Sequence, residues 1–355
     1  MMNSREIVKK ALNFEETERI PAENIIEIIK EVFGYFASLD ESLGEDLART
    51  YDSRSVDKSY SQGFVSDIGY PKFTYGKGRA SGMPYSRGTY IDAWGCVWDV
   101  GENMVKGEVK VPMLTDWGKL DTFQPPWDVL KEADLSGVNS QCEQSDKFMV
   151  HMWGLEPFQR MQYLRGTEAL FMDLAYGDME VFKLRDMVHE YHMKEVELWT
   201  NTDVDAIHIE DDWGTQHNLL ISPKLWRDFF KPIYKDYCDL ARSKGKYVIM
   251  HSDGNIMEII PDLIEIGVSA VNAQLDCMDI EKIAGQFHEK IAFWGGFDRQ
   301  YLLPFGTVEE VRKEVRRIAN AFFKYKRTGI VAQCFWDKGG KAENVYTFYD
   351  EWNKV

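Results

Sequence analysis

The chain has 355 residues and a formal net charge of −16, from 42 basic and 58 acidic residues. This length is enough for one large barrel or two medium-sized domains, and the negative charge argues against a surface that binds nucleic acid or an anionic membrane. No apolar run is long enough to cross a bilayer and the N-terminus lacks the apolar core of a secretion signal, so we expect a cytoplasmic protein. The five cysteines form no CxxC pair, which favours free thiols over a disulfide framework.

The first third of the chain shows an irregular pattern. A capped helix, a short strand and a second helix are expected at Ser4–Leu12, residues 19–22 and residues 25–39. A Gly- and Ser-rich stretch over residues 61–89 predicts a long loop. Residues 90–100 and 104–111 are then predicted to form a β-hairpin.

From Lys147 onwards, strand-like apolar segments alternate with helical patterns. Six strands are expected, at residues 148–151 and 206–209 and around Val248, Val268, Ile291 and Ile330. This alternation implies a parallel sheet, and right-handed crossovers close such a series most simply as a (β/α)8 TIM barrel with an irregular N-terminal extension. The remaining strands must come from the N-terminal third, and residues 1–355 form a single domain in this prediction. A doubly wound open sheet is the alternative.

Polar side chains follow the predicted strands, at the carboxyl ends where parallel α/β proteins gather their ligands. The clearest case is the apolar run that ends at Met250, because His251 and Asp253 follow it directly. The other strand ends carry further polar or aromatic residues, namely His151, Met152, Trp153, Glu210, Asp211, Asp212, Trp213, Asp276, Cys277, Trp294, Asp298, Cys334 and Trp336. An unpaired polar group in an apolar interior costs about 1–3 kcal/mol, so we expect a binding site at this end of the barrel.

An imidazole, carboxylates and a thiol from separate strands suit a tetrahedral zinc ion with one open position. The ligands expected from the sequence are His251 and Cys334, with Asp276 or Glu210 as the third. The alternative is that His251 only hydrogen-bonds a neighbouring carboxylate and that Cys334 is a small core residue.

Three adjacent acids, Glu210, Asp211 and Asp212, follow one another at a single strand end. Because like charges repel, one of them is expected to have a raised pKa or a cationic partner, an arrangement typical of acid–base or metal chemistry. Which of the three acts is left open. The alternative is a solvated loop that leads to an ordinary helix cap at Ser222.

Three longer runs carry a resemblance to a known family. They are DDWGTQHNLLISPKLWRDFFKP (residues 211–232), MHSDGNIMEIIPDLIEIGVSAVN (residues 250–272) and FWGGFDRQYLLPFGTVEEV (residues 293–311), supported by residues 90–98 and 163–177. Together they resemble the uroporphyrinogen decarboxylase superfamily, and within it the branch that includes corrinoid-dependent methyltransferases. The resemblance extends over nearly the whole chain and implies one (β/α)8 barrel.

The resemblance also implies two possible chemistries. The decarboxylases bind a tetracarboxylate porphyrinogen through an arginine-rich N-terminal motif, whereas residues 16–32 of this chain lack paired arginines. The methyltransferase branch holds zinc with a His-x-Cys pair at one strand end, often an acid at the next, and a cysteine at the last strand. His251 matches the histidine, Asp253 replaces the first thiol, Asp276 is the acid, and Cys334 lies at about the place of the last cysteine.

A zinc ion with harder ligands is a stronger Lewis acid, which suits a leaving ether or phenolic oxygen better than a thiol. We therefore expect a zinc-assisted methyltransferase, the O-demethylase component, that moves a methyl group from a small methoxylated, possibly aromatic, or methylamine-type substrate to a corrinoid protein. Asp211, Asp212 or Asp253 would protonate or orient the leaving group. Trp153, Trp213, Trp294 and Met152 would contact the substrate, unless the aromatic residues only pack the rim.

Two other functions are left open. A metal-free decarboxylase of a carboxylated substrate would use the acids at residues 210–212 as proton donors. A binding protein without catalytic activity on the same scaffold is the other, because fold does not dictate function. The oligomeric state is also open, with a homodimer as one alternative.

Overall fold

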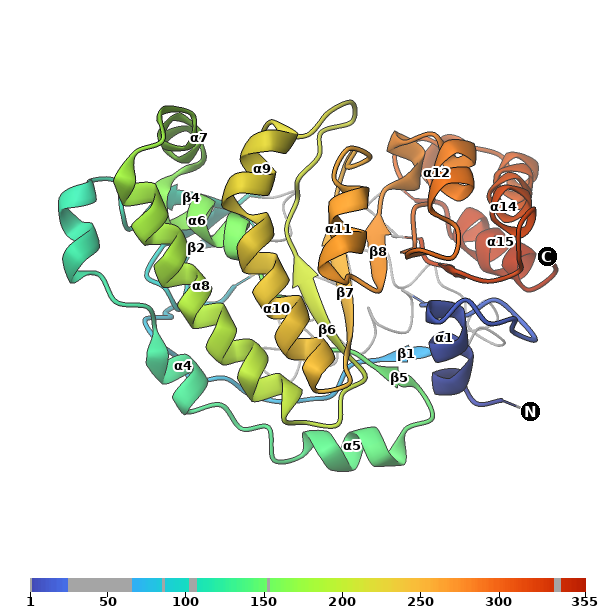
Figure 1. The fold of residues 1–355 in the computed structure, drawn as a ribbon, viewed down its shortest axis with the longest axis horizontal. Helices are drawn as coiled ribbons and strands as arrows, with labels where there is room; N and C mark the ends of the chain where they lie inside the picture. Colours follow the sequence, from blue (N-terminus) through green and yellow to red (C-terminus); the bar gives the residue numbers. More distant parts are fainter. Residues whose placement is uncertain (1, 25–65, 85–86, 102–106, 152–153, 335–339) are drawn as a thin grey trace.

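The computed structural model describes residues 2–24, 66–84, 87–101, 107–151, 154–334 and 340–355 (Figure 1). Its main sheet has five parallel strands in the order β10-β9-β8-β7-β6. They are β6 (Ala206–Glu210), β7 (Tyr247–Ser252), β8 (Ala270–Ala273), β9 (Ala292–Trp294) and β10 (Ile330–Val331). Two further parallel strands, β1 (Ile68–Gly69) and β5 (Phe148–Met149), pair with each other.

Backbone interactions join these two sheets into a closed ring. On one side, Val150 forms a parallel bridge with Ala206 at the start of β6. On the other side, Ala22 forms a parallel bridge with Ala332, directly after β10. The carbonyl of Ala22 also accepts a hydrogen bond of 2.8 Å from the backbone N–H of Asp67, directly before β1. The segment around Ala22, the β1–β5 pair and the five-stranded sheet therefore close the (β/α)8 TIM barrel, and the short strand expected at residues 19–22 is part of it.

The barrel interior is apolar where the strands begin. Its cluster of buried residues includes Ile68, Phe148, Ala206, Ile249, Ala270, Ala292 and Val331. Helix α1 (Ser4–Leu12) adds Val8 and Leu12 to this cluster and so closes that end of the barrel. The expected cap of α1 is present, because the Asn3 side chain accepts from the Glu6 N–H and the Glu6 side chain accepts from the Asn3 N–H. The apolar plug leaves the opposite end, where the strands finish, for polar residues.

Helices cover the outside of the barrel, and α8, α10 and α11 lie along its front in Figure 1. The described helices after α1 are η1 (Trp117–Thr122), α4 (Trp127–Lys131), α5 (Val138–Gln144), α6 (Pro157–Arg165), α7 (Thr167–Tyr176), α8 (Met179–Thr200), α9 (Pro223–Phe229), α10 (Lys231–Ser243), α11 (Ile260–Ile266), η2 (Leu275–Cys277), α12 (Ile280–Phe287), α13 (Leu302–Phe305), α14 (Val308–Phe323) and α15 (Ala342–Trp352). None of them is long and apolar enough to cross a membrane.

Several local predictions differ from the structure. The predicted hairpin is a three-stranded antiparallel sheet, β2 (Gly88–Ile91), β3 (Val97–Val100) and β4 (Glu108–Val111), because a turn at Gly95, with φ of +97°, divides its first arm. The predicted long loop contains β1, which is too short to give a periodic signal. The region after the expected helix cap at Ser222 contains two helices, α9 and α10, that meet at Phe230. The helix expected at residues 25–39 lies outside the described residues.

Candidate functional site

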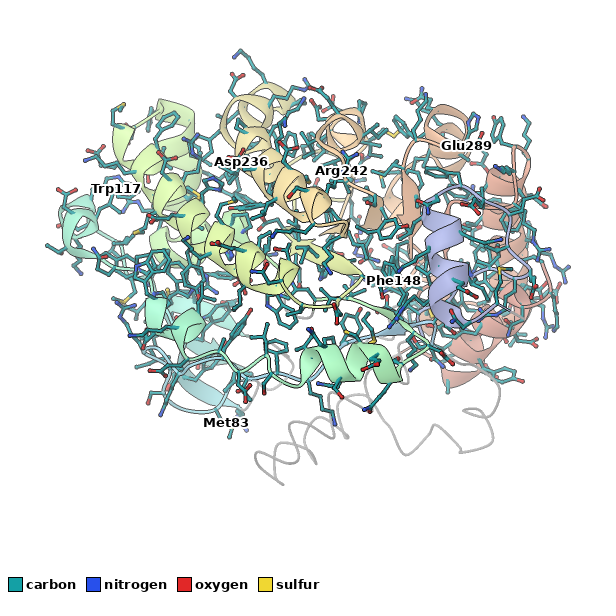
Figure 2. The ribbon with its side chains drawn as sticks, turned by 60° about the horizontal axis from the view of Figure 1, so that its bottom comes forward. Met83, Trp117, Phe148, Asp236, Arg242 and Glu289 are labelled. Atoms are coloured by element: carbon teal, nitrogen blue, oxygen red, sulfur yellow. The ribbon has the colours of Figure 1, made fainter. Side chains whose placement is uncertain are left out.

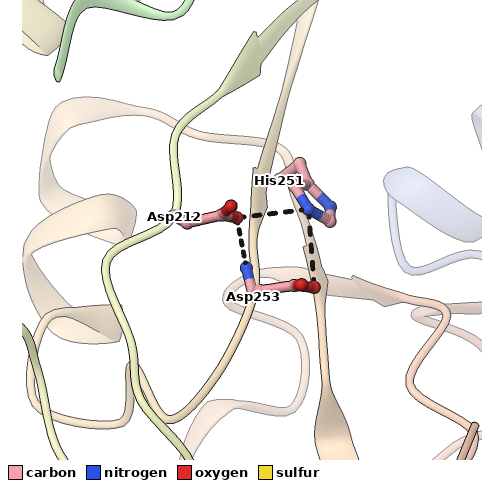
Figure 3. Close-up of side chains that lie close together, drawn as sticks. All are labelled: Asp212, His251 and Asp253. Atoms are coloured by element: carbon pink, nitrogen blue, oxygen red, sulfur yellow. Dashed lines mark hydrogen bonds and ion pairs between the residues drawn. The ribbon is translucent and has the colours of Figure 1, made fainter. Parts of the chain in front are cut away.

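Three ionisable side chains converge at the carboxyl ends of β6 and β7 (Figure 3). His251 Nε2 lies 3.5 Å from Asp212 Oδ1 and 3.7 Å from Asp253 Oδ1. The backbone N–H of Asp253 donates to Asp212 Oδ1 at 2.9 Å, which ties the loop after β7 to the loop after β6. Among the described residues, only this group places three or more possible metal-ligand atoms within 4.8 Å of one another.

The electrostatic field around His251 favours a positive charge. Burial alone lowers the pKa of His251, but the hydrogen bond to Asp212 and the charges of Asp212, Glu210 and Asp253 outweigh burial and raise it to about 9. Arg299, from the loop after β9, pairs with Asp253 Oδ2 at 2.5 Å, so the two carboxylate oxygens of Asp253 face different cations. The site is therefore a cluster of carboxylates that attracts cations.

A buried hydrogen-bonded network lies beneath this cluster. His251 Nδ1 lies 2.5 Å from Asn272 Oδ1, and Asn272 Nδ2 donates to Gln333 Oε1 at 2.8 Å. Gln333 Nε2 in turn donates to Glu23 Oε2 at 2.6 Å. Glu23 also accepts from Trp294 Nε1 at 2.6 Å and from the hydroxyl of Tyr70 at 2.5 Å. The carboxyl end of the barrel interior is thus polar and extensively hydrogen-bonded.

Sequence reasoning missed Glu23, Asn272, Gln333 and Arg299. The signal that could have found Asn272 is a polar residue inside the apolar run of β8, because a buried strand tolerates such a residue only with a partner. Gln333 follows β10 in the same way. Arg299 carries no comparable signal, since it lies in a loop whose path the sequence does not determine.

The three adjacent acids separate in space. Glu210 is the register partner of His251 and acts on it through its charge. Asp211 is fully buried and accepts from the backbone N–H groups of Phe158 and Gln159 at the start of α6, and from Tyr234. Burial raises the pKa of Asp211 well above its usual value. Only Asp212 joins His251, so Asp211 anchors a helix in this structure.

The four residues expected as metal ligands are not gathered in one cluster. Cys334 is buried, burial raises the pKa of its thiol, and it is not one of the three clustered ligands. Asp276, in η2, lies outside the cluster, and burial and the charge of Asp298 raise its pKa to about 6. Glu210 is likewise not one of the three clustered ligands. Of the expected set, the cluster therefore contains His251 alone.

Of the side chains expected to contact substrate, the two that the structure describes, Trp213 and Trp294, are buried. Trp213 is fully buried, stacks on Phe158 with ring centroids 4.0 Å apart, and donates to Tyr234. Trp294 is buried and bonded to Glu23 in the barrel floor. Met152 and Trp153 lie outside the described residues. Packing at the rim was the alternative for these rings, and Trp213 and Trp294 instead pack in the interior of the protein.

A cavity at the opposite end of the barrel has a structural explanation. It measures about 400 Å³ and its lining includes Arg242, Lys246 and Lys290. Lys246 Nζ donates to the carbonyl of Thr202 and Lys290 Nζ to that of Gln286, both at the C-terminal ends of helices, and Arg242 lies at the end of α10 (Figure 2). Cations at helix C-termini balance the helix dipole. We therefore assign no chemistry to this end.

A TIM barrel with an acidic, histidine-containing cluster at the carboxyl ends of its strands defines an enzyme-type scaffold. Residues 150–333 match the family model "Uroporphyrinogen decarboxylase (URO-D)", more than half of the chain. The chain belongs to the URO-D family, as its sequence motifs suggested. The solved structures it resembles include a methyltransferase from Methanosarcina mazei, with a TM-score of 0.70 and 16% identity over 100% of this chain and 99% of that one. No curated protein sequence matches the chain.

The geometry of the cluster fits a small divalent cation. A tetrahedral ion with bonds of about 2.0–2.2 Å separates its ligand atoms by roughly 3.3–3.6 Å. The separations of 3.5 and 3.7 Å around His251 Nε2 are close to this range. A cavity of about 20 Å³, lined by His251, Asp253 and Arg299 among others, adjoins the cluster and has room for one water molecule or ion.

Proposed function

We propose that this protein is a methyltransferase that takes the methyl group from a small methoxylated or methylamine-type substrate and transfers it to a corrinoid carried by a separate protein. Three observations support the proposal: membership of the URO-D family, a fold shared with a methyltransferase, and the acidic cluster at the barrel mouth. The observation that carries it is the placement of Asp212 and Asp253 around His251 Nε2, because this nitrogen and two carboxylate oxygens form a ligand set for zinc.

In this proposal His251, Asp212 and Asp253 hold the zinc ion, in place of the set expected from the sequence. When bound, zinc supplies Lewis acidity to the oxygen or nitrogen atom that loses the methyl group. Arg299 fixes Asp253 through its second oxygen, and the backbone N–H of Asp253 fixes Asp212. The leaving atom needs a proton, and Asp276, with a pKa raised to about 6, is protonated in an appreciable fraction of molecules at a pH near 6.

Metal content decides the first part of the proposal. Elemental mass spectrometry of the purified protein should find about one zinc per chain, and His251→Ala and Asp253→Asn should lose it. Cys334→Ser is the matched control, because Cys334 lies outside the cluster and its variant should keep the metal. Loss of zinc from Cys334→Ser with retention in Asp253→Asn would contradict the ligand set.

Methyl transfer is tested with cob(I)alamin and a panel of methoxylated aromatics and methylamines. Formation of methylcobalamin that stops in chelator and returns with zinc is the expected result. No methylcobalamin across a broad panel would count against the function even if zinc is bound.

A metal-free decarboxylase is the second candidate, and one observation favours it. Without a metal, His251 is cationic up to a pH of about 9 and lines the same cavity as Arg299, so a substrate carboxylate in that cavity would meet two cations that offset the charge of the neighbouring acids. Release of carbon dioxide with full activity in chelator would favour this function over methyl transfer.

A further inference from the structure

The network beneath the cluster has a fixed direction, which follows from two groups whose hydrogen-bonding roles cannot be reversed. The backbone carbonyl of Trp294 can only accept, and Asn272 Nδ2 lies 2.9 Å from it. The amide nitrogen of Asn272 must therefore face Trp294, and its oxygen must face His251. Because Asn272 Oδ1 is an acceptor, His251 Nδ1 must carry a proton and donate it.

The far end of the network gives the same direction independently. The indole Nε1 of Trp294 can only donate, so Glu23 Oε2 is an acceptor whether or not Glu23 is protonated on its other oxygen. Gln333 shares that oxygen and must present its amide nitrogen to it. The carbonyl oxygen of Gln333 then faces Asn272 Nδ2. Both ends of the network agree on the orientation of each amide.

The backbone is shaped to hold this amide pair. Asn272 is the register partner of His251 on β7 and of Trp294 on β9, which places all three at one level of the barrel. A side-chain carbon at Gly295 would lie 2.6 Å from Gln333 Oε1 and 3.0 Å from Asn272 Nδ2. Gly295 also has φ of +88°, so both space and conformation require glycine beside the amides.

We propose that Asn272 is a positioning residue that holds His251 with its proton on Nδ1, so that the unprotonated Nε2 of the neutral ring faces Asp212 and Asp253, where it would bind a cation. Gln333 and Glu23 keep Asn272 in that orientation. The cation-binding consequence rests on the proposed function, whereas the proton position does not. Groups that orient a ligand histidine from its second nitrogen typically change metal affinity by roughly 10–100-fold when removed.

The test compares three variants in two measurements. Asn272→Leu has a similar shape but cannot accept a hydrogen bond from His251, and Asn272→Asp can accept that bond without being oriented by Gln333. Glu23→Gln keeps every hydrogen bond because its amide can donate to Tyr70. Histidine-labelled ¹⁵N spectra of the metal-free protein, recorded at alkaline pH where the ring is neutral, report which nitrogen of His251 carries the proton. Zinc titration against a competing chelator reports affinity.

We expect the wild type, Asn272→Asp and Glu23→Gln to show the Nδ1–H form, and Asn272→Leu to shift towards Nε2–H and bind zinc roughly 10–100-fold more weakly. If Asn272→Leu fails to fold, a wild type or Asn272→Asp protein with the proton on Nε2 overturns the proposal by itself. Unchanged proton position and affinity in folded Asn272→Leu also overturn it. A wild type that binds no zinc but shows the Nδ1–H form refutes the metal site and leaves the positioning role standing.

Discussion

The raised pKa of His251 makes the stability of the metal-free protein depend on pH. In the unfolded chain this ring titrates near 6.5, and in the folded protein near 9, so folding favours the protonated ring. Below pH 6.5 the ring is protonated in both states and its contribution is complete; the contribution is lost as the pH rises from 6.5 through about 9. The pKa difference corresponds to about 3 kcal/mol. Because the Asp212 side chain is 41% exposed, solvent screening lowers the expected effect to about 2 kcal/mol.

Urea unfolding at several pH values between 6 and 9.5, in chelator, measures this dependence, with His251→Gln as the comparison. Glutamine keeps a polar side chain at this position but does not titrate. The free energy of unfolding of the wild type should fall by about 2 kcal/mol more than that of His251→Gln across this range. Parallel pH curves for the two proteins would show that the carboxylates around His251 do not hold a charged ring.

Two further substitutions test the structural roles assigned above. Asp211→Ala should destabilise the protein by about 3 kcal/mol or more in urea unfolding, because three donors at the start of α6 and on Tyr234 lose their acceptor in a buried site; a loss under 1 kcal/mol would contradict this. Gly295→Ala should lower zinc affinity about tenfold or more, measured by chelator competition, by displacing the amides of Asn272 and Gln333; unchanged affinity in the folded variant would contradict the close packing.

The sequence predicted the later strands of the barrel well because each has several consecutive apolar residues before a polar end. Strand β1 escaped prediction because its two residues lie in a Gly- and Ser-rich stretch, whereas the equally short β5 and β10 lie within longer apolar runs. The short strand expected at residues 19–22 is part of the ring, but its pairing with the segment after β10 is a backbone interaction that the sequence pattern does not reveal. The segments that complete the ring of strands are held in place by backbone pairing with the neighbouring strands. Their own residues therefore need not form a recognisable strand pattern.

For the candidate site too, the sequence predicts some features and leaves others undetermined. The alternation of strands and helices predicts that His251 and Asp253 lie at the mouth of the barrel, and Asp212 belongs to the run of three adjacent acids at the end of β6. The choice of partners for His251 could not be made, because it depends on how far each loop extends past its strand. Asp212 lies two residues beyond β6 and Asp253 one residue beyond β7, and the hydrogen bond between their loops brings them to one level. Cys334 follows β10 at a similar distance in sequence but is buried, and no register pattern distinguishes the two outcomes.

The charges at the site link the pKa of His251 to its proposed metal. Glu210, Asp212 and Asp253 bring three negative charges and Arg299 brings one positive charge. The site therefore has an excess of negative charge, which either a proton on His251 or a divalent cation reduces. A zinc ion bound at Nε2 must displace that proton, so binding and protonation compete. Below the pKa of about 9, each unit by which the pH falls should weaken the apparent zinc affinity about tenfold, which gives roughly 100-fold weaker binding at pH 7 than at pH 9. Zinc titrations corrected for the pH dependence of the competing chelator measure this slope. Affinity that stays constant between pH 7 and 9 would place the metal away from His251.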